Sequence, residues 1–132
     1  MLLIKASIST FDFSFIDDSI EKLIMNIEKV AALIAKHNFK YANEKQLQEG
    51  LEELFIQYAL PFRREVRLSS SDIVDFVIDG DQRIGIEVKT GGGKNALLRQ
   101  INRYVTHKEI DSILVIGSPF WVNNLPTELN GK

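Results

Sequence analysis

Two carboxylates and one amine occupy neighbouring segments whose composition predicts β-strands. Asp75 lies in the Ile- and Val-rich segment 73–78, and Glu87 and Lys89 lie in the next such segment, 83–89. A glycine-containing turn separates the segments, as expected for a β-hairpin. Because successive side chains of a strand point to opposite faces, Glu87 and Lys89 share one face. Burying two carboxylates together costs several kcal/mol unless a cation shares their site.

The register of this hairpin decides whether the three side chains meet. The apolar face of the first strand is expected to consist of Val74, Phe76 and Ile78. Asp75 then lies on the opposite face, beside the other two charges, if it pairs across from Gly85 or Glu87; a slip of one residue separates them. Hard oxygen ligands at this density favour Mg²⁺ or Mn²⁺ over zinc. The alternative is that the charges form the solvated face of a half-exposed sheet.

Two further polar residues fall on the apolar sides of expected helices. Glu44 follows Asn43, the expected N-cap, and at about 100° per residue it lies within the apolar stripe of its helix. That stripe is expected to consist of Leu47, Leu51, Leu54, Phe55 and Tyr58. A favourable interaction with the helix dipole is the simpler explanation for Glu44. Gln100, with Tyr104 one turn later, borders the apolar side of a later helix.

In this order the residues resemble the PD-(D/E)XK nuclease superfamily, which has the restriction-endonuclease-like fold. The resemblance rests on Glu44 in Asn-Glu-Lys-Gln-Leu-Gln, Asp75 in Ile-Val-Asp-Phe-Val-Ile, the tripeptide Glu87-Val88-Lys89, and Gln100 in Arg-Gln-Ile-Asn-Arg-Tyr. It covers residues 40–117 approximately, and its specificity comes from the order of short motifs. Val74 stands where the name of the motif has Pro, a departure that members of the superfamily often show.

The resemblance implies a metal-dependent nuclease that hydrolyses the phosphodiester bonds of DNA. The groups that would bind Mg²⁺, or Mn²⁺ in its place, are Asp75, Glu87, the carbonyl of Val88 and Glu44. Lys89 would orient or activate the attacking water and stabilise the transition state. Gln100 would position a phosphate or the substrate strand. A metal suits this chemistry because it lowers the pKa of water and neutralises charge on the phosphate.

The order of expected elements predicts an α/β domain. Residues 1–40 would form an N-terminal segment of this domain. In it, residues 2–15 form a short strand or are irregular, and Ile20–Ile34 belongs to an amphipathic helix. The nuclease-like core, 41–132, would follow within the same single domain. Its expected elements are a helix at 43–58, an edge strand at 64–68, strands at 73–78 and 83–89, a helix at 95–107 and a buried parallel strand at 112–117. This αβββαβ core with an extra N-terminal helix corresponds to a restriction-endonuclease-like mixed central sheet flanked by helices.

The overall composition limits other classes of function. The chain has 132 residues, no cysteine and a formal net charge of −2. Disulfides, thiolate zinc sites and cysteine nucleophiles are therefore excluded. Met1–Thr10 is interpreted as structure and not as a signal peptide, and no apolar window approaches about 18 residues. We therefore expect a cytoplasmic protein without a membrane span.

Contacts with nucleic acid would have to come from local basic clusters, because the chain as a whole is not basic. The candidate DNA-binding residues are Arg63, Arg64, Lys94, Arg99 and Arg103. A solvated surface is the simpler interpretation of such clusters. The alternative function is a non-catalytic nuclease-fold module that binds nucleic acid or a protein partner. A homodimer through Ile20–Ile34 is also expected. DNA versus RNA and endonuclease versus exonuclease action stay open.

Overall fold

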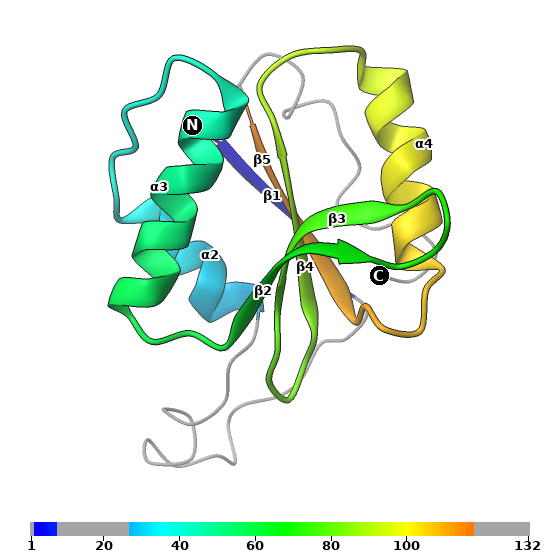
Figure 1. Ribbon diagram of the computed structural model, residues 1–132, viewed down its shortest axis with the longest axis horizontal. Coiled ribbons are helices and arrows are strands. Elements are labelled where there is room, and N and C mark those ends of the chain that lie inside the picture. Colours follow the sequence, from blue (N-terminus) through cyan, green and yellow to red (C-terminus); the bar gives the residue numbers. More distant parts are fainter. Residues whose placement is uncertain (1, 8–26, 118–132) are drawn as a thin grey trace.

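A five-stranded mixed sheet forms the centre of the described chain, which comprises residues 2–7 and 27–117 of a computed structural model (Figure 1). The strands are β1 (Leu2–Ser7), β2 (Phe62–Arg67), β3 (Ile73–Ile78), β4 (Ile84–Lys89) and β5 (Ser112–Gly117). Their order across the sheet is β1-β5-β4-β3-β2, with β4 and β5 parallel and the other neighbours antiparallel. The expected α/β class, the hairpin of β3 and β4, the edge position of β2 and the parallel β5 are thus confirmed.

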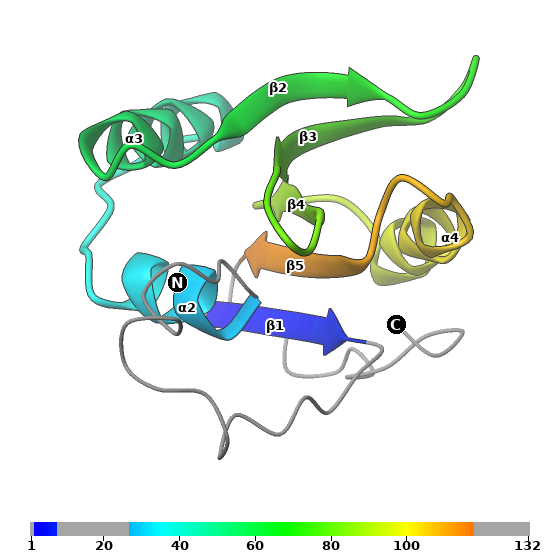
Figure 2. The ribbon, with the colours of Figure 1, turned by 90° about the horizontal axis from the view of Figure 1, so that it is seen from below.

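Helices cover both faces of this sheet (Figure 2). The described helices are α2 (Ile27–Ala35), α3 (Glu44–Gln57) and α4 (Lys94–Val105). One face carries α2 and α3, and α4 lies on the other, where it connects the parallel strands β4 and β5. None of the described helices has the length and apolarity required to cross a membrane. Helices on both faces explain why β5 is buried along its whole length.

Two apolar clusters fill the layers on either side of the sheet. The cluster beneath α2 and α3 includes Ile27, Val30, Ile34, Leu47, Leu51, Leu54, Phe55, Phe76, Ile78, Ile84, Ile86, Val88, Leu114 and Ile116. The cluster beneath α4 includes Val74, Val77, Leu97, Ile101, Tyr104, Val105, Ile110, Ile113 and Val115. The described part of the predicted N-terminal helix thus packs its apolar side chains within the chain's own core, and Ile20–Asn26 lies outside the described residues.

One predicted core residue, Tyr58, is wrongly assigned. Its side chain is 48% exposed, although the preceding members of the α3 stripe are buried. The reason is that α3 ends at Gln57 and Tyr58 is the C-cap residue, with φ −95° and ψ 9°. Helical periodicity no longer determines the direction of a side chain once the helix has ended. The Tyr58 ring instead makes an edge contact with His37, with 5.7 Å between ring centroids.

The alternation expected for β3 also fails at one residue. Val74 belongs to the cluster beneath α4, whereas its predicted companion Phe76 belongs to the cluster on the opposite face. The side chains of the adjacent strand β2 also exchange faces at this point. There Glu65 adopts a positive φ of 50°, and its pairing with Asp75 of β3 is interrupted. A left-handed residue kinks an extended strand. The kink places Asp75 where β3 changes direction.

The N-cap of α3 provides a test of this part of the fold. The Asn43 side chain accepts a hydrogen bond from the Gln46 backbone N–H at 2.9 Å, as the sequence predicts for an N-cap. Replacing Asn43 by Ala removes that acceptor and should lower the free energy of unfolding by about 1 kcal/mol. Urea unfolding measures the change, and Asn38→Ala, at an exposed position before the helix, is the control. Equal stability of the two variants would contradict the capping role.

Candidate functional site

Asp75 and Glu87 meet where β3 and β4 separate. The paired residues of these strands end at Phe76 and Ile86, and continuing the register by one residue places Asp75 opposite Glu87. Beyond this point, carboxylate side chains replace backbone carbonyls as the hydrogen-bond acceptors between the two strands. The Val88 N–H donates to Asp75 Oδ2 at 2.8 Å, and the Asp75 N–H donates to Glu87 Oε2 at 3.3 Å. The two predicted carboxylates therefore lie together in a fork between the strands.

Burial makes ionisation of both fork carboxylates unfavourable. Glu87 is only 5% exposed, and burial, followed by the neighbouring charge of Asp75, raises its pKa to about 9. Burial also raises the pKa of Asp75, although the hydrogen bond from the Val88 amide opposes this effect. Desolvation and a nearby like charge both favour the neutral form of a carboxyl group. The fork therefore holds two acidic groups that a cation would stabilise in their charged forms.

Lys89 supplies positive charge to this pair. Its ammonium lowers the pKa of both Asp75 and Glu87, although burial outweighs that effect at each. The side chain is half-buried beside the glycine-rich loop, residues 90–93, that follows β4. A Cβ built on Gly92 would lie 3.4 Å from Lys89 Cε. The lysine side chain thus passes beside the space into which a Cβ at Gly92 would project.

Gly92 has a positive φ of 88°, a conformation that other residues adopt at a cost. Gly92→Ala should therefore lower the free energy of unfolding by about 1 kcal/mol. Gly91→Ala is the matched control, because a Cβ at Gly91 would meet nothing within 4 Å. Thermal and urea unfolding of both variants would measure the difference. If Gly91→Ala proves as destabilising as Gly92→Ala, the left-handed backbone is not the cause.

Glu44 approaches the same end of β4 from the N-terminus of α3. Its Oε1 accepts a hydrogen bond from the Thr90 N–H at 3.1 Å, directly after the strand. Its charge also contributes to raising the pKa of Asp75 and of Glu87. Within residues 2–7 and 27–117, however, no group of three or more His, Cys, Asp or Glu side chains is arranged as a ready metal site. Glu44 is therefore near the fork pair but not clustered with it.

Gln48 borders the same helix stripe as Glu44 in the sequence, but the sequence alone assigned it no role in the site. It lies one turn after Glu44 on α3, and its side chain lowers the pKa of Asp75 by hydrogen bonding. Gln48 Oε1 in turn accepts a hydrogen bond from Arg64 Nη2 at 3.2 Å. The spacing of four residues from Glu44 is the one signal that could have identified it, because residues i and i+4 share a helix face.

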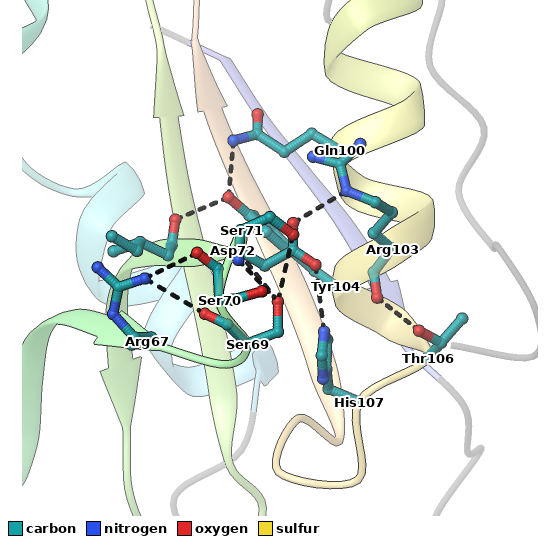
Figure 3. A network of polar contacts seen from close by, with 11 residues as sticks. Arg67, Ser69, Ser70, Ser71, Asp72, Gln100, Arg103, Tyr104, Thr106 and His107 are labelled. Atoms are coloured by element: carbon teal, nitrogen blue, oxygen red, sulfur yellow. Dashed lines mark hydrogen bonds and ion pairs between the residues drawn. The ribbon is translucent and has the colours of Figure 1, made fainter.

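Gln100 lies on the α4 side of the sheet and is held by Tyr104 (Figure 3). Gln100 Nε2 donates to Tyr104 Oη at 2.6 Å, and Tyr104 Oη donates to the Ile73 carbonyl at 2.7 Å. Burial, then the charge of Glu87, raises the pKa of Tyr104. The pair therefore connects α4 to β3 and places a neutral phenol near the fork. The hydrogen bond between Gln100 and Tyr104 orients the Gln100 amide.

A second polar network anchors the loop between β2 and β3 to α4 (Figure 3). Asp72, 4% exposed, accepts from Arg103 Nε at 2.9 Å and contacts His107 Nε2 at 3.3 Å. The hydrogen bond from Arg103 is the main cause that lowers the Asp72 pKa. Ser69 Oγ also accepts from the Asp72 N–H at 3.1 Å. This network fixes the start of β3, which carries Asp75 two residues later.

The candidate DNA-binding residues do not form one surface of unpaired charge. Arg63 pairs with Asp79 through two hydrogen bonds of 2.7 and 2.8 Å. Arg64 bonds to Glu52 and Gln48, and Arg103 bonds to Asp72. Arg99 is exposed on α4, and the Lys94 side chain lies outside the described residues.

Comparison of the chain with family models, with curated proteins and with solved structures found no match.

Proposed function

We propose that the protein is a metal-dependent nuclease whose centre is the fork of Asp75, Glu87 and Lys89, with Glu44 beside it. The observation that carries the proposal is the burial of two adjacent carboxylates next to an amine at the end of β4. A fork with a purely structural role could use apolar or amide side chains with a smaller desolvation penalty. Buried carboxylates, in contrast, need positive charge or hydrogen bonds to compensate for the loss of water. The presence of two acidic groups there supports cation binding.

The donor set suits a hard divalent cation such as Mg²⁺. Mg²⁺ keeps several waters and is commonly bound by one or two carboxylates, so two direct ligands are enough. Asp75 and Glu87 would be these ligands, since each uses one oxygen for a main-chain amide and has a second oxygen. The Val88 carbonyl leaves β4 on the same side as its N–H and would join them. Glu44 would act through a bound water.

Each remaining residue would have a separate task in phosphodiester hydrolysis. When bound, the metal supplies an acidified water and neutralises charge on the phosphate. Lys89 would hold the attacking water or stabilise the extra negative charge of the transition state. Gln100, oriented by Tyr104, would contact the phosphate or the substrate strand. Arg99 and Lys94 belong to α4, the helix that follows the glycine-rich loop, and would contact DNA.

A substrate panel tests this proposal. The purified protein is incubated with supercoiled plasmid, linear duplex DNA, single-stranded DNA and single-stranded RNA, with and without Mg²⁺ or Mn²⁺. We expect cation-dependent cleavage of a DNA substrate, and a loss of at least about 100-fold in Asp75→Asn. Asp81→Asn, at an exposed carboxylate in the β3–β4 turn, is the matched control. Cleavage of RNA alone would reject DNA as substrate, and no cleavage at all would favour a binding module.

A further inference from the structure

The paired strands β2 and β3 change face together at one point beside the fork. In β2, Phe62 packs on the α2 and α3 side of the sheet and Val66 on the α4 side, although residues four apart in a regular strand share a face. In β3, the same division separates the residues on either side of Asp75. Backbone pairing is present on both sides of this point but leaves out Glu65 and Asp75. Figure 1 shows β2 and the start of β3 bending together away from β4, toward α4.

Glu65 has the backbone conformation that accounts for this turn. Its φ of 50° lies in the left-handed region, which residues other than Gly, Asn and Asp seldom adopt. An extended residue at this position would continue the ladder and would keep Val74 and Phe76 on one face. The Glu65 side chain is exposed, so Glu65 is connected to the fork through its backbone. Backbone strain of this kind persists only where the surrounding structure requires it, and it is often found at functional sites.

The turn explains how the Asp75 carboxylate reaches the backbone of β4. The N–H groups of a strand lie in the plane of the sheet and point to the neighbouring strand, whereas its side chains stand roughly perpendicular to that plane. Asp75 Oδ2 nevertheless accepts a hydrogen bond from the Val88 N–H at 2.8 Å. The Asp75 N–H donates to the Glu87 carboxylate at 3.3 Å, where a regular ladder would offer a backbone carbonyl. The change of face thus turns the Asp75 side chain into the space between β3 and β4.

We propose that Glu65 is a positioning residue, whose left-handed backbone turns β3 so that the Asp75 carboxylate lies in the fork in the orientation needed to bind a divalent cation. This inference rests on the proposed function and gives the edge strand β2 a role in the site. The role should depend on the φ values that the residue at position 65 adopts easily, and not on its charge. Groups that orient a metal ligand typically change metal affinity or activity by about 10- to 100-fold when they are removed.

Binding of Mn²⁺ alone, measured by titration calorimetry, tests this role without any substrate. Glu65→Val and Glu65→Asn both remove the carboxylate, but Asn adopts a positive φ readily whereas the β-branched Val does not. Glu65→Val should therefore weaken Mn²⁺ binding by at least about tenfold. Glu65→Asn should bind Mn²⁺ within about twofold of the original protein, and so should Glu65→Gly, because glycine adopts both conformations without strain.

Ala59 provides a matched control for the strain itself. It is the other non-glycine residue with a positive φ in the described part of the chain, at 53°, and it is also exposed. It follows the end of α3, whereas Glu44 lies at the start of that helix, near the fork. Ala59→Val should lower the unfolding temperature, measured without metal, and leave Mn²⁺ binding unchanged.

Hydrogen exchange in the metal-free protein gives a second measurement that does not depend on the cation. The Val88 amide should exchange faster in Glu65→Val than in Ala59→Val, because only the change at position 65 removes the Asp75 carboxylate as its acceptor. Equal protection of this amide in the two variants would contradict the proposed link between Glu65 and Asp75.

The outcomes separate this inference from the proposed function. If the original protein binds Mn²⁺ and cleaves DNA, unchanged affinity in folded Glu65→Val would overturn the positioning role and leave the nuclease proposal in place. An equal loss in Glu65→Asn would also overturn it, since the carboxylate and not the backbone would then matter. If Glu65→Val does not fold, Glu65→Thr, which is β-branched but polar, decides the question in the same way. Failure of the unaltered protein both to bind Mn²⁺ and to cleave would overturn the nuclease proposal and the positioning role together.

Discussion

Replacing Lys89 by Met should lower the rate of cation-dependent cleavage by about 100- to 1000-fold, the loss typical of removing one group that stabilises transition-state charge. Met keeps the length of the side chain and its position beside Gly92 but removes the ammonium. Because Lys89 is half-buried at the end of β4, we expect thermal stability to change little. Initial rates on the best substrate of the panel, at saturating Mg²⁺, measure the effect.

Two further variants define what the amine does. Lys36→Met, at an exposed position after α2, is the control for loss of a positive charge and should keep the original rate. Lys89→Arg retains the charge but cannot exchange a proton near neutral pH. Partial activity in Lys89→Arg would indicate an electrostatic role of the amine. Complete loss of activity in Lys89→Arg would favour activation of the attacking water by the amine. Full activity in Lys89→Met would exclude the amine from the chemistry.

The second large effect concerns stability of the metal-free protein. Folded Glu87 holds its proton up to a pKa of about 9, whereas the unfolded chain releases it near the ordinary value of 4.5. Between these values the unfolded state binds fewer protons, so raising the pH favours unfolding. Each pKa difference of 1 corresponds to about 1.4 kcal/mol, and the total loss by pH 9 should amount to several kcal/mol. Between these two pKa values, the free energy of unfolding should be greatest near the lower, acidic value.

Glu87→Gln removes this titration and should flatten the dependence of stability on pH. Urea unfolding in EDTA, at several values from about pH 5 to about pH 9, measures both curves. The variant should become the more stable protein above neutral pH. Mg²⁺ should restore stability to the original protein at high pH but not to the variant, because it binds the ionised carboxylate. Parallel curves for Glu87→Gln and the original would mean that Glu87 is not buried as described.

Glu53→Gln is the matched control for the stability experiment. Glu53 is an exposed carboxylate on α3, so its neutralisation should leave the pH profile unchanged.

Asp72 acts in the opposite direction at lower pH, because its pKa is lowered by Arg103 and stability is lost as pH falls through that value. The original protein should therefore be most stable at a pH above the titration of Asp72 and below that of Glu87.

Most of the secondary structure could be predicted because its signals are local. Asn43 identifies the start of α3, and the apolar spacing identifies the helix itself. The run Ser112–Gly117 was expected as a buried parallel strand, and this was confirmed because a helix-connected β-α-β unit requires that geometry. Alternation along β4 likewise separates Glu87 from the apolar side chains of Ile86 and Val88.

The sequence by itself determined which chemical groups are available: two acidic side chains and an amine on one hairpin, and an acidic residue at a helix start. Only the tertiary structure decided how they meet. Glu44 bonds to an amide 46 positions away, and the left-handed Glu65 reverses the expected face of Val74. Arg64 and Gln48 likewise become partners only when β2 packs beside α3. The physical reason is that periodicity assigns faces within one element, whereas strand kinks and contacts between elements depend on the packing of the whole core.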